Sequence, residues 1–251
     1  MPPVRRVAAL YDIHGNLPAL ESVLREIRAA DVDRVVIGGD VVPGPMPREV
    51  LHAIFSLDIP TEFISGNGEA EVLRARRGEA LVRVPEAFHS LIHWTAQQLH
   101  PDDERRMAAW PATIRFELAG LGQVMFCHAT PRNDMDVFTR LTAEERLRPL
   151  FDGVADIVVC GHTHMQFDRL VGRTRVVNAG SVGMPWAEPG AYWLLLGPAV
   201  ELRRTSYDLD AAARRVRETT YPQANDFADR NILRPPAESD MLAAYAGLEL
   251  A

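Results

Sequence analysis

The sequence has few cysteines and no repeated or low-complexity segment, which excludes disulfide scaffolds and repeat architectures. Among its 251 residues only Cys127 and Cys160 are cysteines. Each follows an apolar run and stands directly before a histidine or a Gly-His pair. We therefore expect two buried thiols on neighbouring strands of a protein from a reducing compartment, and no disulfide between them.

Long hydrophobic runs and excess positive charge are also missing. No stretch is long enough to span a bilayer, and the N-terminus has no apolar core of the kind found in signal peptides. These features predict a cytoplasmic protein with no membrane attachment. The formal net charge of −7 argues against a general nucleic-acid binder, which needs a basic face. An anionic substrate would need positive charge concentrated at the site, which bound metal could supply.

The composition is that of a globular chain, with 47% hydrophobic and 24% charged residues, and the length suffices for a substantial core. Short apolar strands are predicted at 7–11, 34–37 and 61–64. Amphipathic helices are predicted at 18–29 and 48–55. Strand, polar glycine-containing loop and helix in repetition are typical of βαβ units on a parallel sheet, so the fold class is predicted as α/β.

The repeated pattern of strand, loop and helix ends after the third strand. Residues 70–111 are rich in predicted helix and are expected to form a helical insertion beside the site, where they could shape a substrate pocket. The histidines of this segment (His89, His93 and His100) are expected on its surface. The whole chain, 1–251, is predicted to be one domain that ends in a helix and a polar tail at about 208–251.

The middle and end of the chain predict further strands and helices. Segments 114–118 and 123–127 are expected to form a hairpin. Thr142 to Glu145 resembles a helix start with a capping box. Additional strands are expected at 158–160, 175–178, 191–196 and 200–204, with a helix at 209–218.

Polar side chains gather where the predicted strands end. They are Asp12 and His14, Asp40, Asn67, His128, and His162 with His164. Ligands of open parallel sheets bind outside the carboxyl ends of the strands. Alternate residues of an extended chain face the same way, so His162 and His164 suit one metal pocket, although the pair alone could equally be two surface-loop histidines. Two carboxylates, one amide and four imidazoles suit Mn, Fe, Zn, Co or Ni rather than Ca.

Taken together, these elements resemble a known family. The set Asp12-x-His14, Gly39-Asp40, Gly66-Asn67, His128 and Gly161-His162-x-His164, in this order, resembles the calcineurin-like metallophosphoesterase superfamily. The runs Asp12–Asn16 and Asn178–Ser181 look like its small bacterial and archaeal phosphodiesterase branch. The resemblance covers Val7 to about Ser181 and implies a four-layer αββα sandwich.

The resemblance also implies roles for these residues. Asp40 would bridge two divalent ions, manganese first among the candidates and Fe, Zn, Co or Ni as alternatives. The remaining ligands would divide between the ions as Asp12, His14 and His164 on one, and Asn67, His128 and His162 on the other. Asp40, Asn67 and His128 would be the catalytic residues, and Asn67 would also contact the substrate. The implied reaction is hydrolysis of a small nucleotide-type or aryl phosphodiester by a hydroxide held between the ions.

One position departs from the family pattern. Many relatives carry a histidine directly after the asparagine of the third element, where it can protonate the leaving oxygen. Gly68 occupies that position here. We therefore expect a preference for substrates whose leaving group needs little protonation, such as phosphate-like or aryl groups.

Three further residues are weaker candidates, and several rival functions remain. Asn16 could contact the phosphate or a metal ligand, or simply cap a helix; Arg132 could clamp an anion; Ser181 is expected to be structural. The nearest rivals are a phosphomonoesterase on the same site and a protein phosphatase, whose additional arginines and histidine are not evident. A non-catalytic binding protein on the same fold is disfavoured because the whole ligand set is present. The expected partner is a small phosphoester rather than nucleic acid, and the sequence leaves the oligomeric state open.

Overall fold

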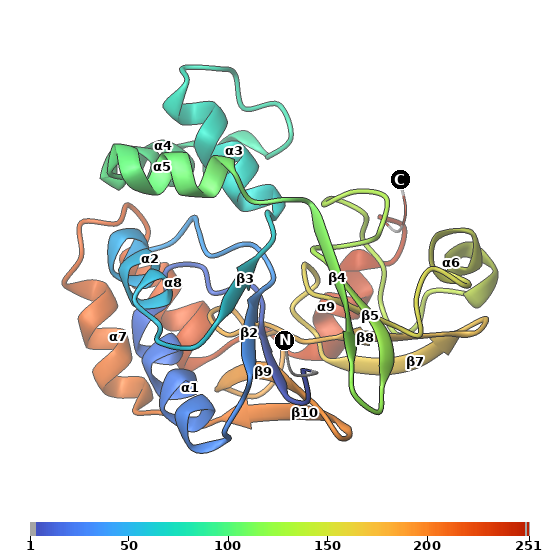
Figure 1. The fold of residues 1–251 in the computed structure, drawn as a ribbon. Helices are drawn as coiled ribbons and strands as arrows, with labels where there is room; N and C mark the ends of the chain where they lie inside the picture. The colour runs from blue at the N-terminus through green and yellow to red at the C-terminus, as the bar shows by residue number, and fades with distance from the viewer. Residues whose placement is uncertain (1–3, 249, 251) are drawn as a thin grey trace.

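The computed structural model describes residues 4–248 and 250, and its centre is a pair of five-stranded sheets packed face to face (Figure 1). The strand order of the first sheet is β10-β9-β1-β2-β3. Its strands are β1 (Val7–Leu10), β2 (Arg34–Ile37), β3 (Thr61–Phe63), β9 (Ala191–Leu196) and β10 (Val200–Thr205). β1, β2 and β3 are parallel, whereas β9 runs antiparallel to β1 and β10 antiparallel to β9.

The second sheet has the strand order β4-β5-β6-β8-β7. Its strands are β4 (Thr113–Leu118), β5 (Gly122–Cys127), β6 (Ile157–Cys160), β7 (Phe167–Val171) and β8 (Thr174–Asn178). β4 and β5 form the expected antiparallel hairpin, and β5, β6 and β8 are parallel. β7 was not expected from the sequence. It is an antiparallel partner of β8 alone, and its mixed burial gives no clean alternation of apolar and polar residues.

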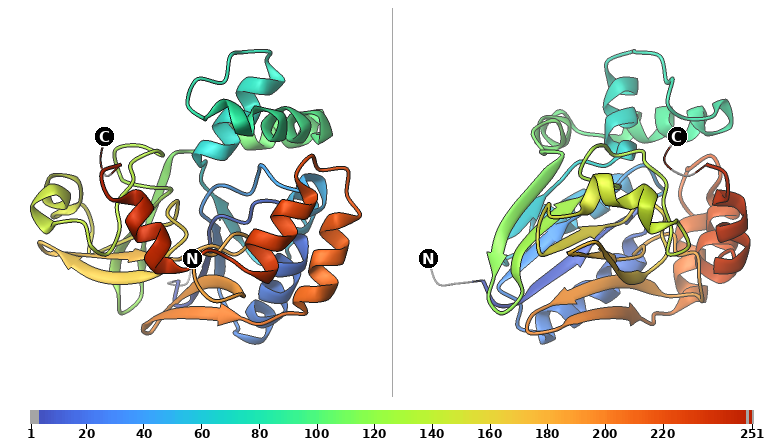
Figure 2. Two further views of the ribbon diagram at one scale, coloured as in Figure 1. Left: turned by 180° about the vertical axis from the view of Figure 1, so that it is seen from behind. Right: turned by 90° about the vertical axis from the view of Figure 1, so that its right-hand side faces the viewer.

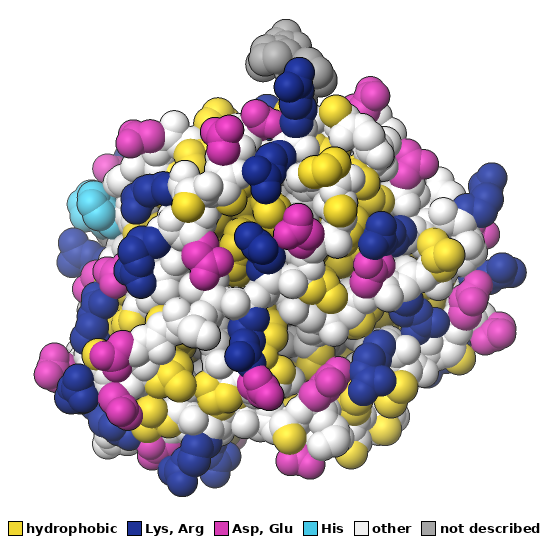
Figure 3. Space-filling model, turned by 90° about the horizontal axis from the view of Figure 1, so that it is seen from below, with side chains coloured by type: hydrophobic (Ala, Val, Ile, Leu, Met, Phe, Trp, Pro, Cys, Tyr) yellow, Lys and Arg dark blue, Asp and Glu magenta, His cyan; other side chains and the backbone are white. Residues whose placement is uncertain are grey.

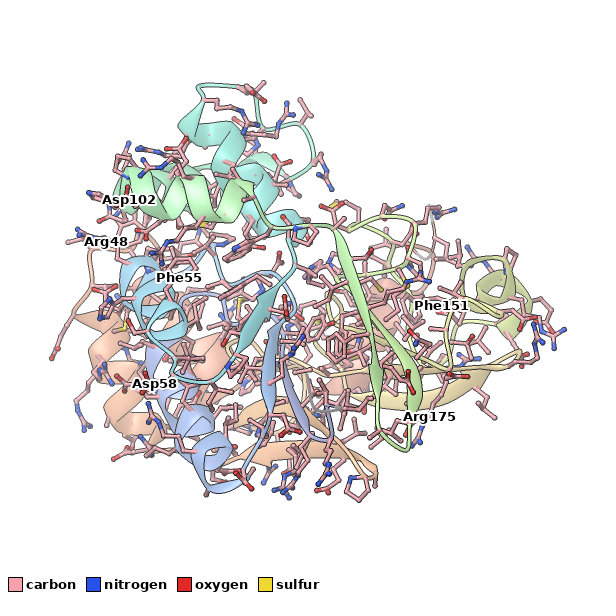
Figure 4. The ribbon with its side chains drawn as sticks, in the orientation of Figure 1. Arg48, Phe55, Asp58, Asp102, Phe151 and Arg175 are labelled. Carbon is pink, nitrogen blue, oxygen red and sulfur yellow. The ribbon has the colours of Figure 1, made fainter. Side chains whose placement is uncertain are left out.

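Helices cover the outer faces of both sheets and complete four layers. Helices α1 (Leu17–Ala29) and α2 (Pro47–Phe55) pack on the first sheet, and α6 (Glu144–Phe151) packs on the second. Alternate residues of β1 serve the two sides: Ala8 and Leu10 face the helices, while Val7 and Ala9 face the other sheet. Phe151 of α6 lies against the second sheet (Figure 4). The predicted α/β sandwich is confirmed.

The insertion lies over one edge of the sandwich (Figure 1). It comprises α3 (Asn67–Arg76), η1 (Glu86–Phe88), α4 (His89–Gln98) and α5 (Pro101–Ala108). One of its anchors is an aromatic cluster around Phe55 of α2 (Figure 4). The Arg106 guanidinium lies 4.7 Å from the Phe55 ring centroid, and the Phe55 ring contacts Trp110. The insertion is thereby fixed to the first sheet's helical layer.

The end of the chain is more ordered than the polar tail that the sequence predicted. After α7 (Leu209–Arg217) come α8 (Ala224–Phe227), the π-helix η2 (Ala228–Leu233) and α9 (Glu238–Tyr245), which follow the back of the molecule (Figure 2). Phe227 and Ile232 are buried in a cluster that also contains Leu91 of the insertion. The prediction failed because prolines divide this segment into helices too short for a clear helical period.

A smaller correction concerns the start of α6. The helix begins at Glu144, and the Thr142 hydroxyl accepts a hydrogen bond from the Thr139 backbone N–H at 2.8 Å instead of capping the helix. Among residues 4–248 and 250, no helix is long and apolar enough to cross a membrane.

Tyr11, directly after β1, joins the two sheets. Its hydroxyl donates to the Val159 carbonyl of β6 at 3.1 Å in the buried interface. We expect Tyr11→Phe to lower the free energy of unfolding by about 1 kcal/mol, because a buried hydrogen bond is lost while the ring is kept. Urea unfolding monitored by circular dichroism measures this. Tyr192→Phe, which removes an exposed hydrogen bond to Glu188, is the matched control, and an equal loss in both variants would contradict the assignment.

Candidate metal centre

The strand ends of both sheets meet in one buried cluster. Asp12 and His14 follow β1, Asp40 follows β2, His128 follows β5, and His164 follows β6. The exposed fractions of these residues run from 0% for Asp12 to 8% for His14. Four segments that are far apart in the sequence therefore place carboxylates and imidazoles in a single buried volume.

The backbone turns sharply at these positions. Asp12, His14, Asp40, His162 and His164 all adopt left-handed conformations, with φ between 47° and 66°. This region is costly for residues other than glycine, and such strain persists only where the surroundings enforce it. Part of that enforcement is a pair of backbone bonds, from Asp12 N to the Gly39 carbonyl at 3.1 Å and from His14 N to the Asp40 carbonyl at 2.9 Å. The strands end here so that the side chains can converge.

Three histidine rings are oriented by backbone carbonyls. Nδ1 of His14, His128 and His164 lies 3.3, 3.0 and 2.7 Å from the carbonyls of Pro43, Gly38 and Met184, respectively. A proton on Nδ1 satisfies each contact. Nε2 is then unprotonated, and its lone pair is directed into the cluster.

Two of these inward nitrogens face each other. His14 Nε2 and His164 Nε2 are 3.2 Å apart. Two electron pairs at that distance repel each other unless a positive charge lies between or beside them. Two nitrogens that are each ~2.1 Å from one metal ion would have a similar separation, so this pair fits a shared cation.

The carboxylates lie between two groups of candidate ligands. Asp12, His14 and His164 form one group, and Asp12, Asp40 and His128 form the other, with the ligand atoms of each group within 4.8 Å of one another. Asp40 directs its two oxygens to different histidines, with Oδ2 at 3.7 Å from His14 Nε2 and Oδ1 at 3.5 Å from His128 Nε2. Asp12 Oδ1 is buried and accepts no hydrogen bond. This arrangement is consistent with a dinuclear metal site, in which Asp12 belongs to both groups; the bridging role expected of Asp40 stays a prediction.

Asn67 and His162 adjoin the second group. Asn67 Oδ1 lies 3.1 Å from His128 Nε2, and the His162 ring centroid lies 5.2 Å from that of His128. The His162 backbone N–H donates to Asp12 Oδ2 at 2.9 Å. The expected ligand roles of these two side chains stay predictions.

The charges of the cluster are interdependent. Burial opposes ionisation of Asp40, but His128 and His14 outweigh burial and lower the pKa of Asp40 below its usual range. Burial likewise opposes protonation of His128, yet Asp40 and Asp12 raise the pKa of His128 to about 10. Burial and the neighbouring His128 charge lower the pKa of His162 to about 4. Without metal, one imidazolium therefore supplies positive charge that a cation would replace.

Glycines beside the ligands leave no space for a side chain. A Cβ on Gly66 would lie 2.2 Å from Asp40 Oδ1, and one on Gly161 would lie 2.5 Å from Asp12 Oδ2. A Cβ on Gly68 would lie 2.2 Å from the Val42 carbonyl oxygen. The histidine found after the asparagine in many relatives could not stand at Gly68 without displacement of the Asp40–Pro43 loop.

Glu69 is an important residue that the sequence did not reveal. Its carboxylate is fully buried and accepts four backbone N–H bonds: Oε2 from Asp40 and Gly66, both at 2.8 Å, and Oε1 from Val41 at 2.7 Å and Val42 at 3.2 Å. Burial and the Asp40 charge raise the pKa of Glu69 to about 7, against these four donors. Its position three residues after the N-cap Gly66 is typical of a capping box and was the available signal.

The weaker candidates have other tasks. Asn16 is fully buried, its Oδ1 caps α1 at Ala19 N, and its Nδ2 donates to the Gly183 carbonyl, so we assign it to the fold rather than to substrate. The Ser181 hydroxyl donates to the Asp12 carbonyl at 2.7 Å, which confirms a structural role. Arg132 is exposed and makes a two-pronged ion pair with Asp136, and its role as an anion clamp stays a prediction.

A pocket of about 320 Å³ opens beside the cluster. His14, Asp40, Asn67 and Gly68 form its inner wall. A second wall comes from the insertion, with Glu71, Val84, Phe88, Leu91 and Ile92. A third comes from the C-terminal segment, with Tyr221, Gln223, Asp226, Phe227, Arg230, Asn231 and Pro236. Met184 also lines the pocket. The C-terminal contribution was missed because that segment was predicted to be a tail.

Comparison with known proteins agrees with this geometry. The calcineurin-like phosphoesterase superfamily domain matches residues 6–197. Uncharacterized protein MJ0912 of Methanocaldococcus jannaschii is 24% identical over 237 residues, which cover 86% of this chain and 94% of that protein.

Solved structures share the fold. Hypothetical protein PH1004 of Pyrococcus horikoshii has a TM-score of 0.77 at 19% identity, with 92% of this chain and 99% of that chain covered. A metallophosphoesterase from Sphaerobacter thermophilus has a TM-score of 0.67 at 23% identity, with 90% and 97% covered.

The fold and the buried Asp and His cluster define a metallophosphoesterase. Because the family match spans most of the sequence, the chain belongs to the calcineurin-like phosphoesterase superfamily. It is a phosphoesterase-family enzyme with a candidate dinuclear metal site.

Glu69→Gln tests the support of the Asp40 loop. The glutamine amide group would face two N–H donors, so we expect a loss of about 1–3 kcal/mol in the free energy of unfolding. We also expect Mn²⁺ affinity to fall about 10–100-fold, because the Asp40 loop is no longer held. Urea unfolding and calorimetric titration measure the two effects. Glu117→Gln on the exposed face of β4 is the control, and unchanged metal affinity in Glu69→Gln would contradict this role.

Metal binding should release a proton. His128, with a pKa of about 10, is protonated in the metal-free site at neutral pH, and a cation must displace that proton. We therefore expect release of about one proton per protein, and an affinity that falls about tenfold for each unit that the pH is lowered between 8 and 6. Calorimetry in buffers of different ionisation enthalpy measures this. An affinity independent of pH would refute the assignment of charge to His128.

Proposed function

We propose that this enzyme is a phosphodiesterase that hydrolyses small nucleotide-type or aryl phosphoesters. The observation that supports this most directly is the position of the pocket: one wall is the candidate metal centre, and the other walls are largely apolar. Such a site suits a substrate with a phosphate at one end and a flat apolar group at the other.

The proposed ligands of the two cations are Asp12, His14, Asp40, Asn67, His128, His162 and His164, and manganese is the first candidate. When bound, two such ions neutralise charge on a phosphoryl group and lower the pKa of a bound water. The chain itself contributes the orientation of these ligands through the carbonyls of Gly38, Pro43 and Met184. Asp40 and Asn67 line the inner wall of the pocket, and His128 lies behind them with its Nε2 3.1 Å from Asn67 Oδ1. These three are the proposed catalytic residues.

Helix α3 contributes positive potential. Its N-terminus is at Gly66 and Asn67, beside the candidate metal centre, and the Gly68 N–H donates to Asp40 Oδ1 at 2.7 Å. A helix N-terminus favours negative charge, such as the phosphate of a substrate. Arg132 is a second proposed anion contact, on the far side of His128.

Other aspects of the proposal concern partners and location. On the face opposite the insertion, acidic and basic side chains are interspersed (Figure 3), which does not favour nucleic acid as a partner. Cys127 and Cys160 are buried free thiols on β5 and β6, which supports a cytoplasmic location.

The absence of an acid at Gly68 should appear in substrate preference. We expect bis(p-nitrophenyl) phosphate to be hydrolysed at least 100-fold faster than an alkyl diester such as dimethyl phosphate, because only the alkyl leaving group needs protonation. Initial rates from pH 6 to 9 with Mn²⁺ measure this. Similar rates on both diesters would defeat the hypothesis.

A phosphomonoesterase on the same site is the second candidate function, since two metal ions can also activate a monoester. If the enzyme is a phosphodiesterase, bis(p-nitrophenyl) phosphate should give a higher kcat/KM than p-nitrophenyl phosphate. Asp40→Asn should reduce both activities by at least 100-fold, because it removes a carboxylate oxygen between the two ligand groups. A metal-free protein without activity under Mn²⁺, Co²⁺ or Ni²⁺ would favour a binding protein instead.

A further inference from the structure

Glu71 is a buried carboxylate with no hydrogen-bond donor. It has no exposed surface, and neither Oε1 nor Oε2 has a hydrogen-bond partner. Among residues 4–248 and 250, Asp12 is the only other residue with a buried, unpartnered carboxylate oxygen. Burial of an ionised group without donors is costly, so the position calls for a partner from outside the chain.

Glu71 also faces the substrate pocket. It follows Asn67 by four residues and Gly68 by three on α3, so all three share one helix face. All three line the pocket beside the candidate metal centre. A ligand whose phosphate lies at the metal centre could therefore present another group to Glu71.

The nearest positive charge does not satisfy this carboxylate. Arg83 Nε lies 3.8 Å from Glu71 Oε1, too far for a hydrogen bond. Arg83 is partly exposed, and its Nη2 donates instead to Asp134. The guanidinium reduces the electrostatic cost of Glu71 and leaves both oxygens free to accept.

The surrounding walls favour a flat ring. Phe88 and Leu91 of the insertion, together with Tyr221 and Phe227 of the C-terminal segment, line the same pocket. Aromatic and aliphatic walls bind the faces of a nucleobase, and its polar edge then needs hydrogen-bond partners. Two free oxygens of one carboxylate match two adjacent donors.

We propose that Glu71 is a specificity-determining residue that binds a pair of adjacent hydrogen-bond donors on the nucleoside part of the substrate. This inference rests on the proposed phosphodiesterase function. Two groups of a nucleotide present such a pair: the N1–H and N2–H edge of guanine, and the cis-diol of ribose. Adenine presents a donor beside an acceptor and would be repelled at one oxygen.

Competition measures this preference. Wild-type enzyme hydrolyses bis(p-nitrophenyl) phosphate with Mn²⁺ in the presence of guanosine, inosine, adenosine or 2′-deoxyguanosine 5′-monophosphate. If guanine supplies the donors, the guanosine nucleotide should inhibit at least tenfold better than the adenosine and inosine nucleotides, and the deoxy form should equal it. If the ribose diol supplies the donors, only the 2′-deoxyguanosine nucleotide should inhibit at least tenfold more weakly than the guanosine nucleotide. Equal inhibition by all four would overturn the proposal.

Glu71→Gln separates recognition from a structural role. The variant should abolish the preference among nucleotides and unfold at a temperature no lower than wild type, since a buried charge is removed. Glu86→Gln, on exposed η1, is the control and should keep the preference. A preference that survives Glu71→Gln, a lower unfolding temperature, or a selective loss of kcat on alkyl diesters would each overturn the proposal.

A second readout does not depend on activity. Saturation-transfer NMR with metal-free protein should detect guanosine, which carries no phosphate, more strongly in wild type than in Glu71→Gln under the guanine outcome. If the ribose diol supplies the donors, guanosine and adenosine should give similar signals with wild type, and both signals should be weaker with Glu71→Gln. Equal signals for wild type and variant would overturn the proposal. If the enzyme hydrolyses bis(p-nitrophenyl) phosphate but shows no preference among nucleotides, the proposed phosphodiesterase function is retained and the proposed role of Glu71 is rejected.

Discussion

The rest of the structure depends on the electrostatic balance between two buried carboxylates and the imidazole nitrogens that face them. Asp12 and Asp40 have almost no exposed surface, and three histidines present Nε2 to them because Nδ1 is held by backbone carbonyls. Negative charge in a dry volume requires a positive counterpart. In the metal-free site the proton on His128 supplies one positive charge, and a pair of divalent cations would supply more positive charge than that.

That balance explains why backbone strain is concentrated at the strand ends. Of the seven proposed ligands, five have left-handed backbones, and the turns also require Gly39, Gly66 and Gly161 because any Cβ would strike a neighbour. Left-handed residues follow β1, β2 and β6 and direct side chains across the edge of the sheet rather than along its faces. Strain at one edge is tolerated because the sandwich behind it is regularly paired and densely packed.

The sequence predicted the parts of this arrangement that have local signatures. β2 has the predicted bounds, and the polar residues after β1, β2, β5 and β6 could be placed at one edge because parallel strands end together. The capping-box position of Glu69 signalled only its bond to Gly66 N; its three bonds to backbone N–H groups of the distant Asp40–Val42 loop could not be predicted from the sequence. The helices after Tyr221 were missed because prolines divide the segment into helices too short for a clear helical period, and Phe227 and Ile232 are buried by packing on α7 and on Leu91 of the insertion.

Helix α3 shows how one short segment divides several tasks. Asn67 contacts His128, Gly68 donates its N–H to Asp40, Glu69 holds the Asp40 loop, and Glu71 faces the pocket one turn later. The two unpartnered carboxylates differ in one respect: Asp12 is surrounded by imidazole nitrogens, whereas Glu71 has a guanidinium nearby and apolar walls around it. Asp12 is thus placed to bind a cation. Glu71, already partly neutralised, is placed to accept hydrogen bonds from a neutral group, which is the property that distinguishes a specificity residue from another metal ligand.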